Sequence, residues 1–116
     1  MNLNWIKCDG SQWCNFFTLN LNHEHFNGLQ GVYIIWHGGQ KPLTVYVGKG
    51  EIKNRILLHR QNPNILKYSH LGLFVTWAFV DSPYQEGVER YLANNLNPLE
   101  CERSPEVVPI QVNFPW

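Results

Sequence analysis

The chain has 116 residues, of which 44% are hydrophobic and only 16% charged, and its formal net charge is zero. Against a prior of about one domain per 150 residues, this length predicts a single domain over residues 1–116, and the composition excludes a disordered chain. The longest mainly apolar run, residues 71–80, is shorter than the roughly 20 residues of a membrane-spanning helix, and residues 1–10 contain no hydrophobic signal region. We therefore expect a cytoplasmic protein with no membrane partner.

The N-terminal part contains two of the three cysteines. Cys8, Cys14 and Cys101 cannot all pair within one chain, and none belongs to a CxxC unit. We therefore predict reduced thiols. The alternative is a zinc site built from Cys8, Cys14, His23 and His25, but this spacing matches no common zinc finger.

The first two-thirds of the chain predict three strands and one helix. Alternating apolar and polar residues predict a strand with one buried face over residues 17–21. Two β-branched and aromatic runs, residues 31–36 and 43–48, flank a Gly/Pro turn and predict a β-hairpin. Apolar residues at helical spacing then predict a helix over residues 52–60, which ends at an Asn-Pro pair.

The last third predicts one more strand, one more helix and a packed tail. Residues 71–80 are apolar on both faces, which indicates a central strand paired with the hairpin. Ser82 as the N-cap, with Gln85 completing a capping box, predicts the start of a helix that ends at Asn97. The apolar tail, residues 107–116, is expected to pack back on the domain. The predicted fold is α/β (α+β), with a small, mixed, largely antiparallel central sheet built on the hairpin and flanked by helices.

Charge is unevenly distributed along the chain. Residues 41–70 contain six basic residues and one acidic residue, whereas residues 81–106 contain six acidic and two basic residues. A basic segment favours contact with phosphates, and an acidic segment favours a bound cation. The alternative is two solvated faces of opposite charge that attract each other.

Two tripeptides on the predicted hairpin, with single residues on the two predicted helices, resemble the GIY-YIG nuclease family in order and spacing. The tripeptides GVY and YVG are conservative variants of the family motifs. The resemblance covers residues 31–98. The residues that carry it are Gly31, Val32, Tyr33, Tyr46, Val47, Gly48, Arg55, His59, Glu89 and Pro98.

The resemblance implies a catalytic role for each matched polar residue. It makes Tyr33 the catalytic tyrosine and Tyr46 the second tyrosine. Three further matched residues, Lys49, Arg55 and His59, complete the catalytic set. The basic residues Lys49, Lys53, Arg55 and Arg60 are the candidate contacts to nucleic acid.

The resemblance also implies a carboxylate that binds a metal ion. It favours Glu89 over Glu86, because Leu92 and Pro98 follow Glu89 at the family's spacing. The family's asparagine just beyond the proline is absent, and Asn113 is the candidate to replace it. The implied cofactor is one divalent cation, Mg²⁺ or Mn²⁺, since hard cations prefer carboxylate oxygen and Mg²⁺ often keeps only one or two protein carboxylates.

These residue types suit phosphodiester hydrolysis. The Arg55 fork would stabilise charge on the scissile phosphate. Tyr33 would contact the attacking water and act as general base if neighbouring cations lower its phenol pKa of about 10. His59 falls on the same helix face as Arg55 and could accept a proton or bind a phosphate oxygen.

The resemblance implies a metal-dependent endonuclease that hydrolyses phosphodiester bonds in DNA. The alternative is a catalytically inactive GIY-YIG-like module that binds nucleic acid or protein. Charge does not distinguish DNA from RNA, because both present backbone phosphates. Three routes to a substrate stay open: recognition of DNA structure, a protein partner or homodimer, and cleavage with little sequence preference.

Overall fold

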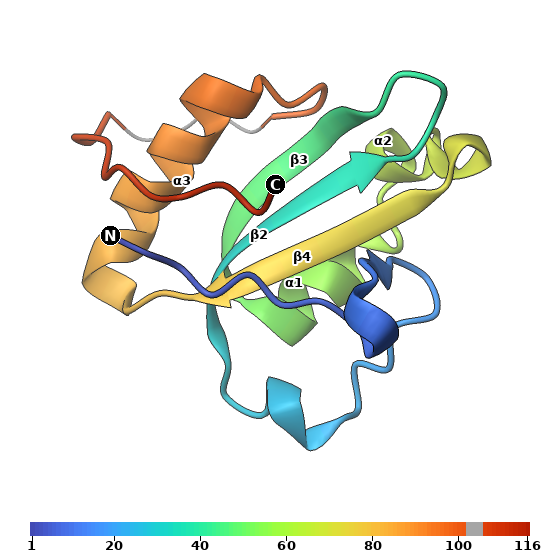
Figure 1. Ribbon diagram of the computed structural model, residues 1–116, viewed down its shortest axis with the longest axis horizontal. Helices are drawn as coiled ribbons and strands as arrows, with labels where there is room; N and C mark the ends of the chain where they lie inside the picture. The colour runs from blue at the N-terminus through green and yellow to red at the C-terminus, as the bar shows by residue number, and fades with distance from the viewer. Residues whose placement is uncertain (102–105) are drawn as a thin grey trace.

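The computed structural model describes residues 1–101 and 106–116, which form one four-stranded antiparallel sheet with helices on both faces. The strand order is β1–β4–β2–β3 (Figure 1). The strands are β1 (Cys14–Asn15), β2 (Gln30–His37), β3 (Leu43–Glu51) and β4 (Leu73–Phe79), and the α-helices are α1 (Ile52–His59), α2 (Pro63–Leu66) and α3 (Ser82–Leu96). Short 3-10 turns occur at Asp9–Ser11, Glu24–Phe26 and Ser69–Leu71. The predicted α+β class is confirmed.

The β2–β3 hairpin is the centre of the fold, and its register depends on two glycines. Gly31 lies so close to the carbonyl of Ala78 on β4 that a Cβ at this position would collide with it. Gly48 is opposite Tyr33 in the β2–β3 ladder, and the Tyr33 ring lies over the space that a Cβ would fill. The glycines of GVY and YVG are therefore required by close approach.

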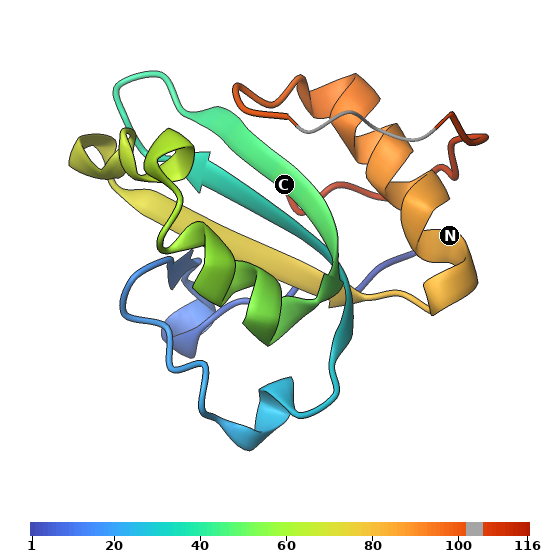
Figure 2. The ribbon, with the colours of Figure 1, turned by 180° about the vertical axis from the view of Figure 1, so that it is seen from behind.

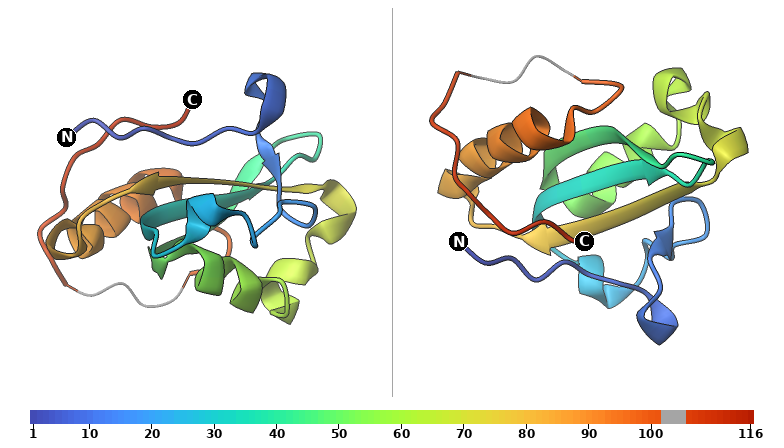
Figure 3. Two further views of the ribbon diagram at one scale, coloured as in Figure 1. Left: turned by 90° about the horizontal axis from the view of Figure 1, so that it is seen from below. Right: turned by 45° about the horizontal axis from the view of Figure 1, so that its top comes forward.

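Each face of the sheet has its own core. On one face, α1 packs Ile52 and Ile56 against Tyr33 and Tyr46 of the hairpin. On the other face, α3 and the C-terminal segment pack against a second cluster, whose buried members are Val32, Ile34, Trp36, Val47, Val80, Val88, Leu92 and Val112. Figure 2 shows α1 and α2 in front of the sheet, and Figure 3 shows both chain termini on the opposite side from these two helices.

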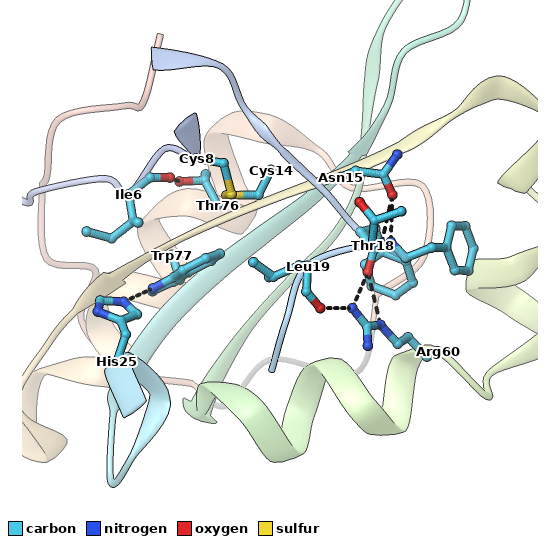
Figure 4. The surroundings of a disulfide bond; sticks show 12 residues. Ile6, Cys8, Cys14, Asn15, Thr18, Leu19, His25, Arg60, Thr76 and Trp77 are labelled. Carbon is cyan, nitrogen blue, oxygen red and sulfur yellow. Dashed lines mark hydrogen bonds between the residues drawn. A yellow bond between two sulfur atoms is a disulfide. The ribbon is translucent and has the colours of Figure 1, made fainter. Parts of the chain in front are cut away.

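The N-terminal segment differs from both sequence predictions made for it. Residues 17–21 form no strand, and two backbone carbonyls in this region, those of Phe16 and Leu19, instead accept hydrogen bonds from the Arg60 guanidinium. Cys8 and Cys14 form a disulfide, so the prediction of reduced thiols is wrong for this pair (Figure 4). The disulfide joins two segments that both lie along the outer edge of β4.

The helix α3 and the tail agree with the predictions except at one helix end. The N-cap of α3 is Asp81 rather than Ser82, and the Gln85 side chain donates to the carbonyl of Val80 instead of completing a capping box. The helix ends at Asn97 in the left-handed conformation, as expected. The tail packs back on α3, where Ile110 donates to the Gly87 carbonyl. No helix in the described part of the chain is long and apolar enough to cross a membrane.

Candidate active site

Tyr33 is the centre of a cluster of polar and aromatic side chains on the α1 face of the hairpin. Its side chain is fully buried, and its ring crosses Gly48 toward the outer strand β3. The Tyr46 ring lies nearly parallel to it, with the two centroids 6.0 Å apart. The missing side chain at Gly48 is therefore what makes room for this pair.

Helix α1 directs two residues at this pair. Because Arg55 and His59 are four residues apart, they lie on the same face of the helix. The His59 Nε2 atom is 2.6 Å from the Tyr33 hydroxyl oxygen, and the Arg55 Nε atom donates to the same oxygen over 3.1 Å. A longer contact of 3.4 Å joins Arg55 Nη2 to the Tyr46 hydroxyl. The structure thus brings four sequence-predicted residues into one network.

The network fixes the direction of its hydrogen bonds. A guanidinium only donates, so the Tyr33 oxygen accepts from Arg55 and its own proton is directed at His59 Nε2. Neutral His59 then carries its proton on Nδ1, an assignment that follows from the network rather than from an observed hydrogen. The buried Nδ1 atom has no hydrogen-bond partner in the described structure. His59 is therefore oriented by Tyr33 and by packing against Tyr46, with ring centroids 4.4 Å apart.

Burial controls the protonation of both partners. Desolvation raises the pKa of Tyr33 well above its usual value of 10.0, although the positive charge of Arg55 opposes this shift. Desolvation and the Arg55 charge together lower the pKa of His59 from 6.5 to about 4. At neutral pH the pair is thus a phenol and a neutral imidazole. The lowered tyrosine pKa considered from the sequence is not present in this state, because burial outweighs the nearby cation.

Glu89 is the carboxylate whose charge acts on Tyr33 of this cluster. It lies half-buried on α3, and its negative charge contributes to the raised pKa of Tyr33. Glu86, one turn earlier, is exposed. In the described ranges no three His, Cys, Asp or Glu residues gather in a way that could hold a metal ion. A single carboxylate still fits Mg²⁺, which commonly keeps most of its waters and shares one or two carboxylates with substrate phosphate.

The other predicted site residues lie outside the network. Lys49 is opposite Val32 in the ladder, so its side chain leaves the sheet on the face away from Tyr33. Lys53 Nζ is 3.4 Å from the side-chain oxygen of Asn22. Arg60 binds backbone carbonyls, as described above, and Asn113 donates to the backbone carbonyl of Leu3 over 3.0 Å. Asn113 is therefore not brought to the tyrosines.

Separate roles were expected for Tyr33 and His59 from the sequence, and the hydrogen bond between their side chains was not predicted. The available signal was the four-residue spacing of Arg55 and His59, which places both opposite the hairpin.

Compared with protein-family models, with curated proteins and with solved structures, the chain matches none. Chemically, the network offers a proton acceptor in contact with a phenol, beside a fixed positive charge.

Proposed function

We propose that this chain is a metal-dependent endonuclease that hydrolyses phosphodiester bonds in DNA. The observation that carries the proposal is the shared hydrogen-bond network of Tyr33, His59 and Arg55, which joins a phenol, an imidazole and a guanidinium. Phosphodiester hydrolysis needs a proton taken from water and negative charge stabilised on phosphate oxygens. These three groups can perform both tasks.

In the proposed mechanism, a rearrangement admits the attacking water to the buried Tyr33 hydroxyl, and Tyr33 passes a proton from this water to His59. The phenol gives its proton to His59 Nε2 over the 2.6 Å contact while it takes one from the water, so Tyr33 ends neutral and His59 ends protonated. This relay does not require a stable phenolate, which agrees with the raised pKa of Tyr33. Arg55 holds the phenol oxygen throughout and stabilises the developing charge.

Glu89 is the proposed ligand for one Mg²⁺ or Mn²⁺. When bound, the cation would supply charge stabilisation for the leaving oxygen. The Glu89 carboxylate supplies the hard oxygen donor that such cations prefer. Its negative charge also contributes to the raised pKa of Tyr33. Lys49, on the other face of β3, is proposed to contact the DNA backbone rather than the reacting phosphate.

Cleavage of supercoiled plasmid with Mg²⁺, with Mn²⁺ and with chelator tests the proposal. We expect metal-dependent nicking in the wild type and a loss of about 100-fold or more for Arg55→Ala and for Tyr33→Phe, in line with the removal of one group that acts on developing charge. Glu89→Gln should abolish the metal-dependent reaction. Glu86→Gln is the matched control, because Glu86 is exposed on the same helix, and it should cleave as the wild type does. A folded wild type that cuts nothing, or an active Glu89→Gln variant, would refute the proposal.

One observation favours the second candidate, a catalytically inactive module that binds nucleic acid or protein. The Tyr33 side chain is fully buried and its hydroxyl already contacts Arg55 and His59, so a reacting water needs room that a rearrangement must provide. DNA binding without cleavage, unchanged in Tyr33→Phe, would favour this module. RNA in place of DNA in the same assay tests the choice of nucleic acid.

A cytoplasmic location is also part of the proposal, and the disulfide provides its test. Structural disulfides are rare where glutathione and thioredoxin keep thiols reduced, so the Cys8–Cys14 disulfide counts against this location. Thiol alkylation at the moment of cell lysis, followed by mass measurement, should find Cys8 and Cys14 reduced if the chain resides in the cytoplasm. A quantitatively intact disulfide would argue for an oxidising compartment. Sedimentation with and without DNA tests whether a homodimer or another partner is needed.

A further inference from the structure

Three tryptophans gather on the sheet face away from the Tyr33 network. The tryptophan cluster, defined here as Trp13, Trp36 and Trp116, lines a cavity of about 440 Å³ together with residues of β3 and the end of α3. The three rings meet edge to face at centroid distances of 5.2 to 6.1 Å. Trp36 is 9% exposed and Trp116 is 59% exposed, so the cavity has a fixed floor and an accessible rim.

The polar atoms of the tryptophan cluster are available to a ligand. The indole N–H groups of Trp5 and Trp77 each donate to a protein acceptor. Within residues 1–101 and 106–116, no protein acceptor meets the N–H groups of the cluster, and those of Trp13 and Trp36 are not sealed from solvent. Because indole N–H groups near a protein interior usually find an acceptor, a ligand that offers both a flat apolar surface and acceptor atoms fits this cavity.

Charge around the cluster narrows the class of ligand. The Lys7 ammonium lies 4.5 Å from the centre of the Trp13 ring, and Lys41 directly precedes the lining residue Pro42. No acidic side chain is among the described lining residues. A cationic ligand would be repelled by Lys7, whereas a planar ring that carries a negative group is favoured. A nucleobase joined to phosphate has this combination, and aromatic platforms beside basic residues are how proteins hold unpaired strands.

The cavity is joined to the candidate active site by two elements. Along β3, Thr44 at the cavity and Gly48 beneath Tyr33 are four residues apart, or about 13 Å. Along α3, Asn95 at the cavity and Glu89 are six residues apart, or about 9 Å. These lengths run along the elements only, and a bound strand must also pass around the edge strand β3 to reach the opposite face of the sheet.

From this placement we infer that the tryptophan cluster binds an unpaired nucleobase of the nucleic-acid strand whose backbone is cut at the Tyr33 network. The inference rests on the proposed function for the position of the cut and on the cluster itself for base binding. It names the substrate class: DNA with unpaired nucleotides next to a duplex or strand break, in preference to continuous duplex.

Binding and cleavage are measured separately, so that the two proposals can fail independently. In chelator, a fluorescein-labelled ten-residue oligothymidylate is titrated with wild type, Trp116→Ala and Phe79→Ala, and binding is followed by anisotropy. Trp116→Ala should weaken binding at least fivefold, the lower end for the loss of one stacked base. Phe79 is 62% exposed at the far end of β4, so Phe79→Ala is the matched control and should bind as the wild type does. Lys7→Gln should lower the salt dependence of binding by about one ion.

Each outcome has a distinct meaning. Weaker binding by Trp116→Ala alone, with unfolding midpoints unchanged, supports base binding even if no variant cleaves DNA. With Mg²⁺, wild type should cut duplexes that carry an unpaired tail faster than blunt duplexes, and Trp116→Ala should lose this preference. Equal oligothymidylate binding by wild type and Trp116→Ala overturns the inference, as does a dimer that Trp116→Ala dissociates, because the cluster would then hold a second copy. Cleavage with no tail preference overturns the link between the two sites and leaves the nuclease proposal standing.

Discussion

The wild-type protein should lose stability as the pH falls from about 6.5 to 4, and replacing His59 with glutamine should remove much of this loss. Burial and the adjacent Arg55 lower the pKa of His59 from 6.5 to about 4. In that window the unfolded chain takes up a proton at this residue and the folded chain does not, so acidification favours unfolding; above pH 6.5 the contribution is fully present. At about 1.4 kcal/mol per pH unit the window amounts to roughly 3 kcal/mol, which we reduce to about 2 kcal/mol for solvent screening.

The assay is urea unfolding at half-unit steps from pH 4 to pH 8, for wild type, His59→Gln and His70→Gln. Other groups titrate in the same range, so the quantity to compare is the difference in free energy of unfolding between each variant and the wild type. For His59→Gln this difference should become more favourable to the variant by about 2 kcal/mol as the pH falls. His70 is exposed, and its replacement is the control for the loss of a histidine as such. A His59→Gln curve parallel to that of the wild type, or an imidazole that titrates near pH 6.5 by NMR, would refute the reasoning.

Three further changes test contacts around the site. Gly48→Ala should destabilise the fold by about 1 to 3 kcal/mol in urea unfolding, because the new methyl collides with the Tyr33 ring; unchanged stability would contradict that close approach. Arg60→Ala should cost about 2 kcal/mol of stability through the loss of its bonds to backbone carbonyls while it leaves DNA affinity intact, and the opposite pattern would restore its predicted role in nucleic-acid binding. Reduction of the Cys8–Cys14 disulfide should lower the free energy of unfolding by about 2 kcal/mol, and a Cys8→Ser/Cys14→Ser variant should not respond to the reductant.

The elements that were predicted correctly are those whose signals are local. The β2–β3 hairpin follows from two runs of β-branched and aromatic residues around a Gly/Pro turn, and α1 follows from apolar spacing that ends at Asn62 and Pro63. β4 was predicted because an apolar run covered on both faces belongs inside a sheet, and it indeed pairs on both sides. The end of α3 at Asn97 was likewise marked by a residue that tolerates the left-handed conformation.

The N-terminal segment was predicted incorrectly because distant residues determine its structure. The alternation at residues 17–21 would bury one face only beside a partner strand, and Phe17 is instead exposed while Arg60, from beyond α1, holds the backbone. Cys8 meets Cys14 because the segments on either side both hydrogen-bond to β4: Ile6 donates to the carbonyl of Trp77, and Cys14 pairs with Val75. Neither the cysteine count nor their spacing contains that information.

The predictions for the candidate site also succeeded where short-range spacing determines the structure and failed where distant segments determine it. Gly48 beneath Tyr33 is a cross-strand pair, and Arg55 with His59 is a single helical turn, so short-range spacing was enough to bring these residues together. The preference for Glu89 over Glu86 depends on how α3 is rotated, and the burial of Val88 and Leu92 leaves Glu89 half-buried and Glu86 in solvent. Asn113 could not be placed by any such rule, because its position depends on the path of the tail, which passes beside Leu3. The same path carries Trp116 to Trp13 and Trp36, so the tryptophan cluster in which we infer base binding is assembled from three distant segments and has no motif in the sequence.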